Sequence, residues 1–137
     1  MAVILVASDA SYIHDELRAA LAGEHEIVPI GGGRSVRQAV VDRRVDLAIL
    51  DLQMGSMGGI ATTMDLHLEE SGGRIEHVAV LLLLDRRADV FMARRAEAEG
   101  FLVKPISPLK LRKAVREILA GNDYEDDAYT PSPVLAT

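Results

Sequence analysis

The sequence predicts an α/β fold in which five parallel strands alternate with five helices. Short, continuous apolar runs recur along the chain, and stretches with apolar residues at helical spacing separate them. Continuous apolar runs are typical of strands that are buried on both faces, as in a parallel sheet. Regular alternation with helices favours a doubly wound sheet that has helices on both sides. We expect strands at residues 2–7, 25–30, 46–50, 78–84 and 100–103.

The first three helices are predicted from apolar stripes. Each stripe repeats every three or four residues, a spacing that places side chains on one face of a helix. The stripe of the first helix, which follows Ser8-Asp9, comprises Ile13, Leu17, Ala20 and Leu21. The stripe of the second helix, for which Ser35 is the expected N-cap, comprises Val36, Ala39 and Val40. The stripe of the third helix, which ends at residues 71–73, comprises Ile60, Met64 and Leu68.

The fourth helix is expected between Arg86 and Ala98, and the fifth has the clearest end signals. Ser107 is a natural N-cap, Pro108 suits the first helical position, and Gly121 suits the C-terminal end. The apolar stripe of this fifth helix comprises Leu111, Val115, Ile118 and Leu119.

Composition limits the class of protein. The 137 residues are enough for one domain, and 49% of them are hydrophobic, so the chain can form a core. The net charge of −6 disfavours direct binding to nucleic acid, which needs many cations to neutralise phosphates. The lack of cysteine excludes disulfides and thiolate chemistry, and the longest apolar run is shorter than the roughly 20 residues that span a bilayer. We expect a cytoplasmic protein that contacts no membrane.

The expected domain covers residues 1–121. The remaining residues, 122–137, include four acidic residues and two prolines and have no periodic apolar pattern. We therefore expect this segment to be a flexible acidic tail that is too short to form an output domain.

Charged residues follow three of the expected strands. Asp9 comes after the first strand, Asp51 closes the third, and Lys104 follows the fifth. The carboxyl ends of parallel strands meet at one edge of the sheet, where open α/β sheets bind ligands. Two carboxylates suit a hard divalent cation, and an ammonium suits a phosphoryl oxygen. The sequence therefore predicts one polar site at this edge.

Three segments around these residues resemble the receiver domain of bacterial two-component response regulators. They are ILVASD at 4–9, DLAILDLQMGSMGGI at 46–60 and GFLVKPISP at 100–108. The resemblance extends from about Val3 to Gly121, in the family's order and with similar spacing. It implies a flavodoxin-like sheet with strand order 2-1-3-4-5, in which the first and third strands are neighbours.

The resemblance also implies roles for individual residues. In the family, the aspartate that matches Asp51 accepts a phosphoryl group from a histidine kinase. The acid that matches Asp9 and the backbone carbonyl that matches Gln53 bind Mg²⁺ together with that aspartate. The lysine that matches Lys104 pairs with the phosphoryl group, and its peptide bond to Pro105 is cis.

Two positions depart from the family pattern. Ser8 stands where the family has the first of two adjacent acids, so we expect weak binding of Mg²⁺. The family's fourth strand ends in a Ser or Thr that hydrogen-bonds the phosphoryl group, whereas the matching position here is Leu82. A shift in register gives Leu83 or Leu84, so no hydroxyl is restored. Phe101 matches the family's switch aromatic residue.

These departures leave two functions open. The chain is either a phosphoryl-transfer switch of reduced efficiency, phosphorylated on Asp51, or a pseudo-receiver that binds a partner or itself without phosphate. The first function requires a sensor histidine kinase or a phosphotransfer protein and, if the chain is complete, a protein output partner. Neither function is that of an enzyme with an external substrate, because the activity would be limited to phosphorylation and dephosphorylation of the chain itself.

The family's partner or dimer surface consists of the fourth helix, fifth strand and fifth helix. Lys113 and Arg116 provide positive charge in the fifth helix, and Glu97 and Glu99 provide negative charge near the end of the fourth. Charges of both signs favour a self-complementary contact between two copies of the chain. We therefore expect this surface to form a homodimer.

Overall fold

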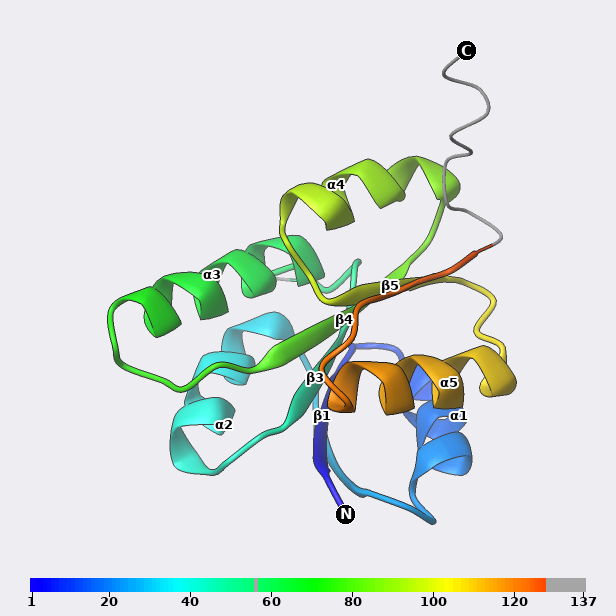
Figure 1. Ribbon diagram of the computed structural model, residues 1–137, viewed down its shortest axis with the longest axis horizontal. Helices are drawn as coiled ribbons and strands as arrows, with labels where there is room; N and C mark the ends of the chain where they lie inside the picture. The colour runs from blue at the N-terminus through cyan, green and yellow to red at the C-terminus, as the bar shows by residue number, and fades with distance from the viewer. Residues whose placement is uncertain (56, 128–137) are drawn as a thin grey trace.

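The computed structural model describes residues 1–55 and 57–127, which form a three-layered α/β fold (Figure 1). The strands are β1 (Val3–Ala7), β2 (Glu26–Ile30), β3 (Leu47–Asp51), β4 (Ala79–Leu84), β5 (Gly100–Val103) and β6 (Tyr124–Glu125). The α-helices are α1 (Ser11–Leu21), α2 (Val36–Asp42), α3 (Gly59–Ser71), α4 (Val90–Arg95) and α5 (Pro108–Leu119). Two 3₁₀ turns, η1 (Gly33–Ser35) and η2 (Arg87–Asp89), precede α2 and α4.

The sheet has the order β2-β1-β3-β4-β5-β6, and every neighbouring pair is parallel. The flavodoxin-like fold and the order of the first five strands are thereby confirmed, and β6 is an addition. Ala7 lies opposite Leu50, and Asp51 lies opposite Leu83. The carboxyl ends of β1, β3 and β4 therefore meet at one edge of the sheet.

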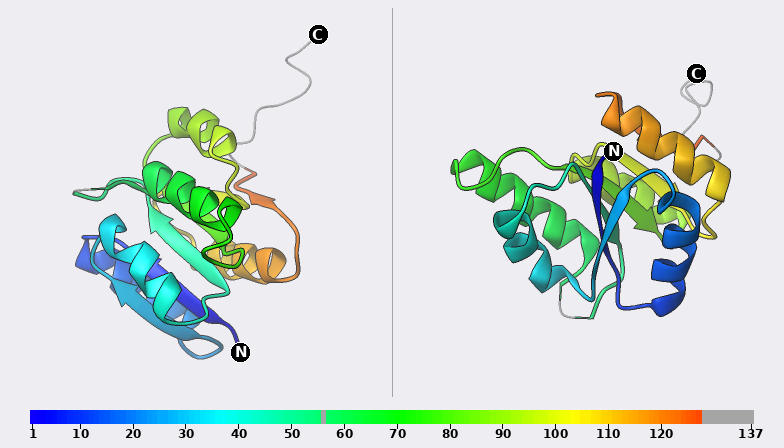
Figure 2. Two further views of the ribbon diagram at one scale, coloured as in Figure 1. Left: turned by 90° about the vertical axis from the view of Figure 1, so that its left-hand side faces the viewer. Right: turned by 90° about the horizontal axis from the view of Figure 1, so that it is seen from below.

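Two apolar clusters form the core, one on each face of the sheet. Helices α1 and α5 cover one face, where they pack on Ile49 and Leu83, and α2, α3 and α4 cover the other, where they pack on Leu50 and Leu82 (Figure 2). Every residue of β3 is buried, which explains why this strand is a continuous apolar run until Asp51. Within residues 1–55 and 57–127, no helix combines the length and apolar character needed to cross a membrane.

The structure confirms the apolar stripes of the first and fifth helices. Ile13, Leu17 and Leu21 of α1 are buried against the sheet, as are Leu111, Val115 and Ile118 of α5. The Ser107 hydroxyl caps α5 by accepting a hydrogen bond of 3.3 Å from the Lys110 N–H. Ser35 does not cap α2 with its side chain, because it belongs to η1 and has a helical backbone conformation.

The stripe predicted for the third helix is wrong at two of its three positions, since only Ile60 packs against the core. Met64 and Leu68 are 55% and 66% exposed, and the buried face of α3 carries Gly59, Thr62, Thr63 and Leu66 instead. The hydroxyls of the two threonines donate to the carbonyls of Gly58 and Gly59, at 2.9 and 2.7 Å. Because the helix satisfies these hydroxyls internally, threonine can be buried at the sheet without losing a hydrogen bond.

Gly59 allows α3 to begin directly beside the end of β3. A Cβ atom at this position would lie 2.7 Å from the Asp51 carbonyl oxygen and 3.0 Å from Leu82 Cδ2. The backbone itself cannot move aside, so only glycine permits this close approach. The N-terminus of α3 is thereby fixed next to Asp51.

Residues 122–127, which the sequence places in a flexible tail, instead extend the sheet. The Asp126 N–H donates to the Phe101 carbonyl at 3.1 Å, so β6 runs beside β5 (Figure 1). The buried Asp126 carboxylate accepts hydrogen bonds from the Val103 N–H at 3.2 Å and from Lys110 Nζ at 2.8 Å. The tail therefore does not begin at residue 122, and its residues 128–137 lie outside the described part of the chain.

A second acid, Glu125, forms an ion pair that connects β6 to α4. The Glu125 carboxylate accepts from Arg94 Nε and from its terminal nitrogen, at 2.9 and 2.6 Å. Together with the contact of Asp126, this pair joins β6 to the helices on both faces of the sheet. The acidic run suggested a solvated segment because its cationic partners, Arg94 and Lys110, are distant in the sequence.

Replacing Asp126 with Asn tests whether β6 belongs to the folded domain. The amide cannot match the charge-assisted bond to Lys110, so the free energy of unfolding should fall by about 1–3 kcal/mol. Asp123→Asn is the matched control, because Asp123 is an exposed acid of the same segment. Urea denaturation of both variants gives the comparison, and equal, small losses would show that β6 contributes little to stability.

Candidate functional site

Asp51 is a buried carboxylate at the end of the central strand β3, and both of its oxygens have a donor. The Ser8 hydroxyl donates to Oδ2 at 2.7 Å, and Lys104 Nζ donates to Oδ1 at 2.6 Å. A buried charge is costly unless it is paired and hydrogen-bonded. Ser8 and Lys104, which directly follow β1 and β5, satisfy this requirement together.

The hydrogen bonds around Ser8 define the direction of its proton. The Ala10 N–H donates to Ser8 Oγ at 3.0 Å, so the hydroxyl proton is left for Asp51. His14 Nε2 lies 2.7 Å from the Ser8 carbonyl oxygen and must carry a proton there, because a carbonyl only accepts. Ser8, expected as a lost acid, is therefore an oriented donor to Asp51.

Lys104 is shared between two carboxylates. Besides Asp51, its Nζ donates to Asp85 Oδ1 at 2.9 Å, and its backbone N–H donates to the Leu84 carbonyl at 2.8 Å. Sequence analysis did not single out Asp85. The sequence pattern that identifies Asp51 also applies to Asp85, because Asp85 follows the apolar run 78–84 directly, just as Asp51 ends its own run.

The two carboxylates keep Lys104 protonated. Burial lowers the pKa of Lys104, but hydrogen bonds and charge attraction from Asp51 and Asp85 outweigh it, so the pKa is raised above its ordinary value. The ammonium is only 16% exposed. The site therefore contains a fixed positive charge beside the Asp51 carboxylate.

Asp9 lies at the solvent-exposed edge of the site. Its carboxylate accepts from the Gly55 N–H at 2.9 Å and so joins the loop after β1 to the loop after β3. Gln53, whose carbonyl is the expected third ligand, is exposed in that second loop. Among residues 1–55 and 57–127, no group of three or more acidic or histidine side chains is arranged to hold a metal ion.

The two expected switch positions are buried side by side. Leu82 lies opposite Phe101 in the register of β4 and β5, and both pack on the face covered by α2, α3 and α4. Leu84 points to this same face, and Leu83 to the other. The Lys104–Pro105 peptide bond that follows β5 is cis.

The charges expected at a dimer contact lie in two different surroundings. Glu99 Oε2 bonds to His77 Nε2 at 2.7 Å, and Oε1 accepts from the Val80 N–H at 2.9 Å. Lys113 and Arg116 instead line a groove between α5 and the end of α1. Glu99 is therefore occupied within its own chain, and the structure does not gather the four charges into one patch.

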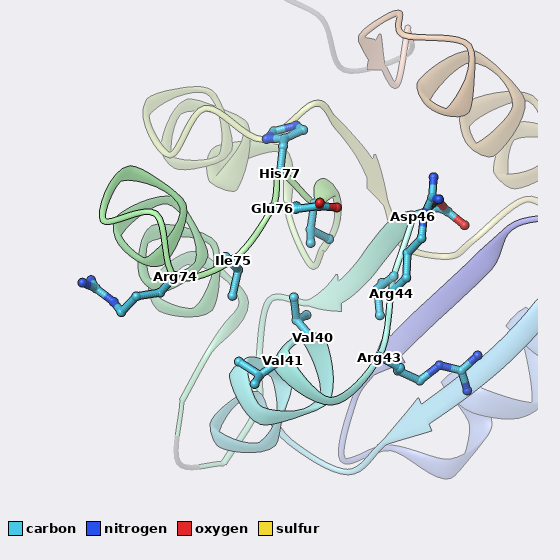
Figure 3. A pocket seen from close by; sticks show the side chains of 11 residues that line it. Val40, Val41, Arg43, Arg44, Asp46, Arg74, Ile75, Glu76 and His77 are labelled. Carbon is cyan, nitrogen blue, oxygen red and sulfur yellow. Dashed lines mark hydrogen bonds and ion pairs between the residues drawn. The ribbon is translucent and has the colours of Figure 1, made fainter.

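A hollow of about 410 Å³ lies at the opposite edge of the sheet, before β3 and β4 (Figure 3). Arg43 and Arg74 at its rim point away from it, and each pairs with a carboxylate at 2.8 Å. The hollow is thus separated from Asp51 by the length of the strands. Neither Arg43 nor Arg74 provides it with an unpaired cation.

A doubly wound sheet with a lysine-paired aspartate at the end of β3 defines the receiver class of signalling domains. The response regulator receiver domain family matches residues 4–116, and the chain belongs to this family. Receiver domains act in two-component signalling, where they interact with histidine kinases and output partners and typically bind Mg²⁺ at the phosphorylation site. They are in general not enzymes.

Two curated relatives are similar over the receiver region. The nitrate/nitrite response regulator protein NarL of Escherichia coli (strain K12) is 35% identical over 86 residues, 63% of this chain and 38% of NarL. The DNA-binding response regulator MtrA of Mycobacterium tuberculosis (strain ATCC 25618 / H37Rv) is 30% identical over 125 residues, 89% of this chain and 52% of MtrA. The chain thus spans about half the length, or less, of these relatives.

Solved structures share the fold. The signal receiver domain of a signal transduction histidine kinase from Syntrophus aciditrophicus matches with a TM-score of 0.77 at 24% identity, covering 88% of this chain and 92% of that one. The isolated receiver domain of RcsB from Salmonella enterica serovar Typhimurium, determined with the phosphomimetic BeF₃⁻, matches with a TM-score of 0.77 at 15% identity, covering 93% and 95%.

Ser8→Ala tests the role of the hydroxyl as a donor. The substitution leaves Asp51 Oδ2 and the Ala10 N–H without their partner, so the free energy of unfolding should fall by about 1–3 kcal/mol. Ser11→Ala, at an exposed position at the start of α1, serves as the control. Urea denaturation that gave the same result for both variants would contradict the proposed hydrogen bond.

His77 should make stability depend on pH. Its Nδ1 faces Glu70 and its Nε2 faces Glu99, each at 2.7 Å, in a hollow that His67 and Glu97 also line. The hydrogen bond to Glu70 raises the pKa of His77; burial opposes this, and Glu99 adds to it.

Because the folded pKa is raised, this stabilisation is complete below the ordinary pKa of 6.5 and is lost as pH rises through the folded pKa. His77→Gln should therefore cost more stability at about pH 6 than at about pH 9. Urea denaturation at both pH values measures the difference, and a pH-independent cost would show that the protonated ring is not the stabilising form.

Proposed function

We propose that this chain is a receiver protein of a phosphorelay that accepts a phosphoryl group on Asp51 with reduced efficiency. The observation that carries the proposal is the buried Asp51 carboxylate, held at the end of β3 with Lys104 Nζ at 2.6 Å. A carboxylate oxygen in this position is a nucleophile beside a fixed ammonium, which can pair with an oxygen of the incoming phosphoryl group.

The proposed donor is a phosphohistidine of a sensor kinase or of a phosphotransfer protein. Its P–N bond breaks while a P–O bond to Asp51 forms, and the imidazole keeps the electron pair of the broken bond. The product is an acyl phosphate on Asp51. Phosphoryl transfer depends mainly on positioning and on neutralising the charge of the transferred group, so Lys104 has the central electrostatic role.

The residues of this edge fit a hard divalent cation in the type of their donors. We assign Asp9, Asp51 and the Gln53 backbone carbonyl as the ligands of Mg²⁺, because all three supply oxygen. When bound, the ion neutralises the carboxylate and the phosphoryl oxygens. Binding should be weak, because Ser8 supplies a hydroxyl to Asp51 instead of a further carboxylate.

Reduced efficiency follows from the apolar end of β4. Leu82 and Leu84 are fully buried and offer no hydroxyl to a phosphoryl oxygen. A missing hydrogen bond to a charged group costs about 1.5–3 kcal/mol, which is enough to separate a strongly coupled switch from a weakly coupled one. Phe101, packed beside Leu82, then lacks a partner that would pull it towards the site.

The proposed output is contact with a protein partner. The receiver domain, expected at residues 1–121, is proposed to include β6 as well, because β6 joins its sheet. The protein is proposed to act in the cytoplasm. MtrA is a DNA-binding response regulator, but its similarity to this chain ends within about half of its length. A homodimer is also proposed; of the four charges expected at its contact, Lys113, Arg116 and Glu97 are kept, and Glu99 is left out because it bonds to His77.

A second candidate function is a phosphorylation-independent interaction module. Both Asp51 oxygens already have donors, and Lys104 is already paired with two carboxylates. A site satisfied in this way is stable without a phosphoryl group, as a pseudo-receiver requires.

Incubation with acetyl phosphate and Mg²⁺, followed by intact mass measurement, separates the two functions. The first predicts a single added phosphoryl group on a minority of molecules, with no label on Asp51→Asn. Omission of Mg²⁺ should lower the labelled fraction further. An unlabelled wild type, or equal labelling of Asp51→Asn, would contradict phosphorylation of Asp51 and favour the interaction module.

A further inference from the structure

We infer that Asp85 determines how strongly this site binds a phosphoryl group, because its carboxylate occupies part of the Lys104 ammonium in the resting protein. This inference rests on the proposed function of Asp51. Asp85 follows β4 directly, and the residues at the end of that strand are all leucine.

The geometry divides the ammonium between two acids. A lysine ammonium has three protons, of which one points to Asp51 Oδ1 at 2.6 Å and another to Asp85 Oδ1 at 2.9 Å. A phosphoryl group on Asp51 needs the same ammonium. It therefore meets a cation whose charge is already partly neutralised.

Asp85 depends on Lys104 for its own stabilisation. Its Oδ2 is buried and has no hydrogen-bond partner among residues 1–55 and 57–127. The adjacent Arg86 is directed to Asp89, whose carboxylate accepts from the Arg86 N–H at 2.9 Å and from its guanidinium at 3.2 Å. Any movement of Lys104 towards a phosphoryl oxygen thus weakens the interaction that balances the Asp85 charge.

The total charge acts in the same direction. Lys104 carries one positive charge against the carboxylates of Asp51 and Asp85, and phosphorylation converts the single charge on Asp51 into a dianionic group. Asp85 then lies beside a dianion and shares its cation. The Asp85 carboxylate and the phosphoryl dianion on Asp51 repel each other. Solvent reduces this repulsion, because the Asp85 side chain is 32% exposed.

The backbone holds this arrangement in place. The Lys104 N–H donates to the Leu84 carbonyl at 2.8 Å, immediately before Asp85. The lysine is therefore attached to the end of β4 through both its main chain and its side chain. Removing the Asp85 charge should free the ammonium without moving the strand.

Asp85→Asn tests the inference with BeF₃⁻ and Mg²⁺ as the probe, measured by isothermal titration calorimetry. The expected result is an affinity about tenfold tighter than that of the wild type, which corresponds to about 1.4 kcal/mol. Asp85→Ala should show a similar gain, since both variants remove the charge. The gain should shrink at high salt, because salt screens the repulsion in the wild type.

Asp42→Asn is the matched control, because it removes the same charge from an exposed position at the end of α2. It should leave the affinity for BeF₃⁻ unchanged. Urea denaturation of all variants separates an effect on binding from an effect on stability. Labelling with acetyl phosphate should follow the same order as BeF₃⁻ affinity.

The outcomes distinguish the inference from the proposed function. A wild type that binds BeF₃⁻ as tightly as Asp85→Asn, or more tightly, overturns the inference and leaves phosphorylation of Asp51 in place. A gain that persists unchanged at high salt also overturns it, because the effect would not be electrostatic. If neither the wild type nor Asp85→Asn binds BeF₃⁻ or takes label on Asp51, the proposed function fails and the inference fails with it.

Discussion

The interaction on which the rest of the structure depends is the ion pair between Asp51 and Lys104. A carboxylate buried at the end of a central strand needs a charge-assisted partner, and Lys104 provides it at 2.6 Å. The elements around the pair are arranged to fit it. Gly59 is needed because α3 begins against the Asp51 carbonyl. The order of the strands brings the carboxyl ends of β1, β3, β4 and β5 together at the pair.

The same pair explains why the residues that contact it matter. Ser8 contributes a hydrogen bond to Asp51 instead of a negative charge, and Asp85 contributes a negative charge beside Lys104. The resting site is therefore well satisfied internally. A phosphoryl group or a cation must compete with contacts that already exist, which is the physical reason to expect a less efficient phosphoryl switch.

The sequence was sufficient for the features that depend on local pattern. The buried strands, Asp51 at the end of one of them and the cap at Ser107 were predictable, because apolar runs and capping residues act over a few positions. The burial of Thr62 on α3 was not, since a threonine hydroxyl satisfied within a helix looks polar in the sequence. The placement of Asp126 and Asp85 also required the structure, because their cations lie far along the chain.

A double-mutant cycle of Asp51→Asn and Lys104→Met, followed by urea denaturation, tests the central claim most directly. Each single variant should lose stability, because Asp51→Asn removes one of the two carboxylate partners of Lys104, and Lys104→Met leaves the buried Asp51 carboxylate without its charged partner. The double variant should lose less than the sum of the two, with a coupling free energy of about 1–3 kcal/mol. Losses that add to within about 0.5 kcal/mol would show that the two residues do not interact and would contradict the account.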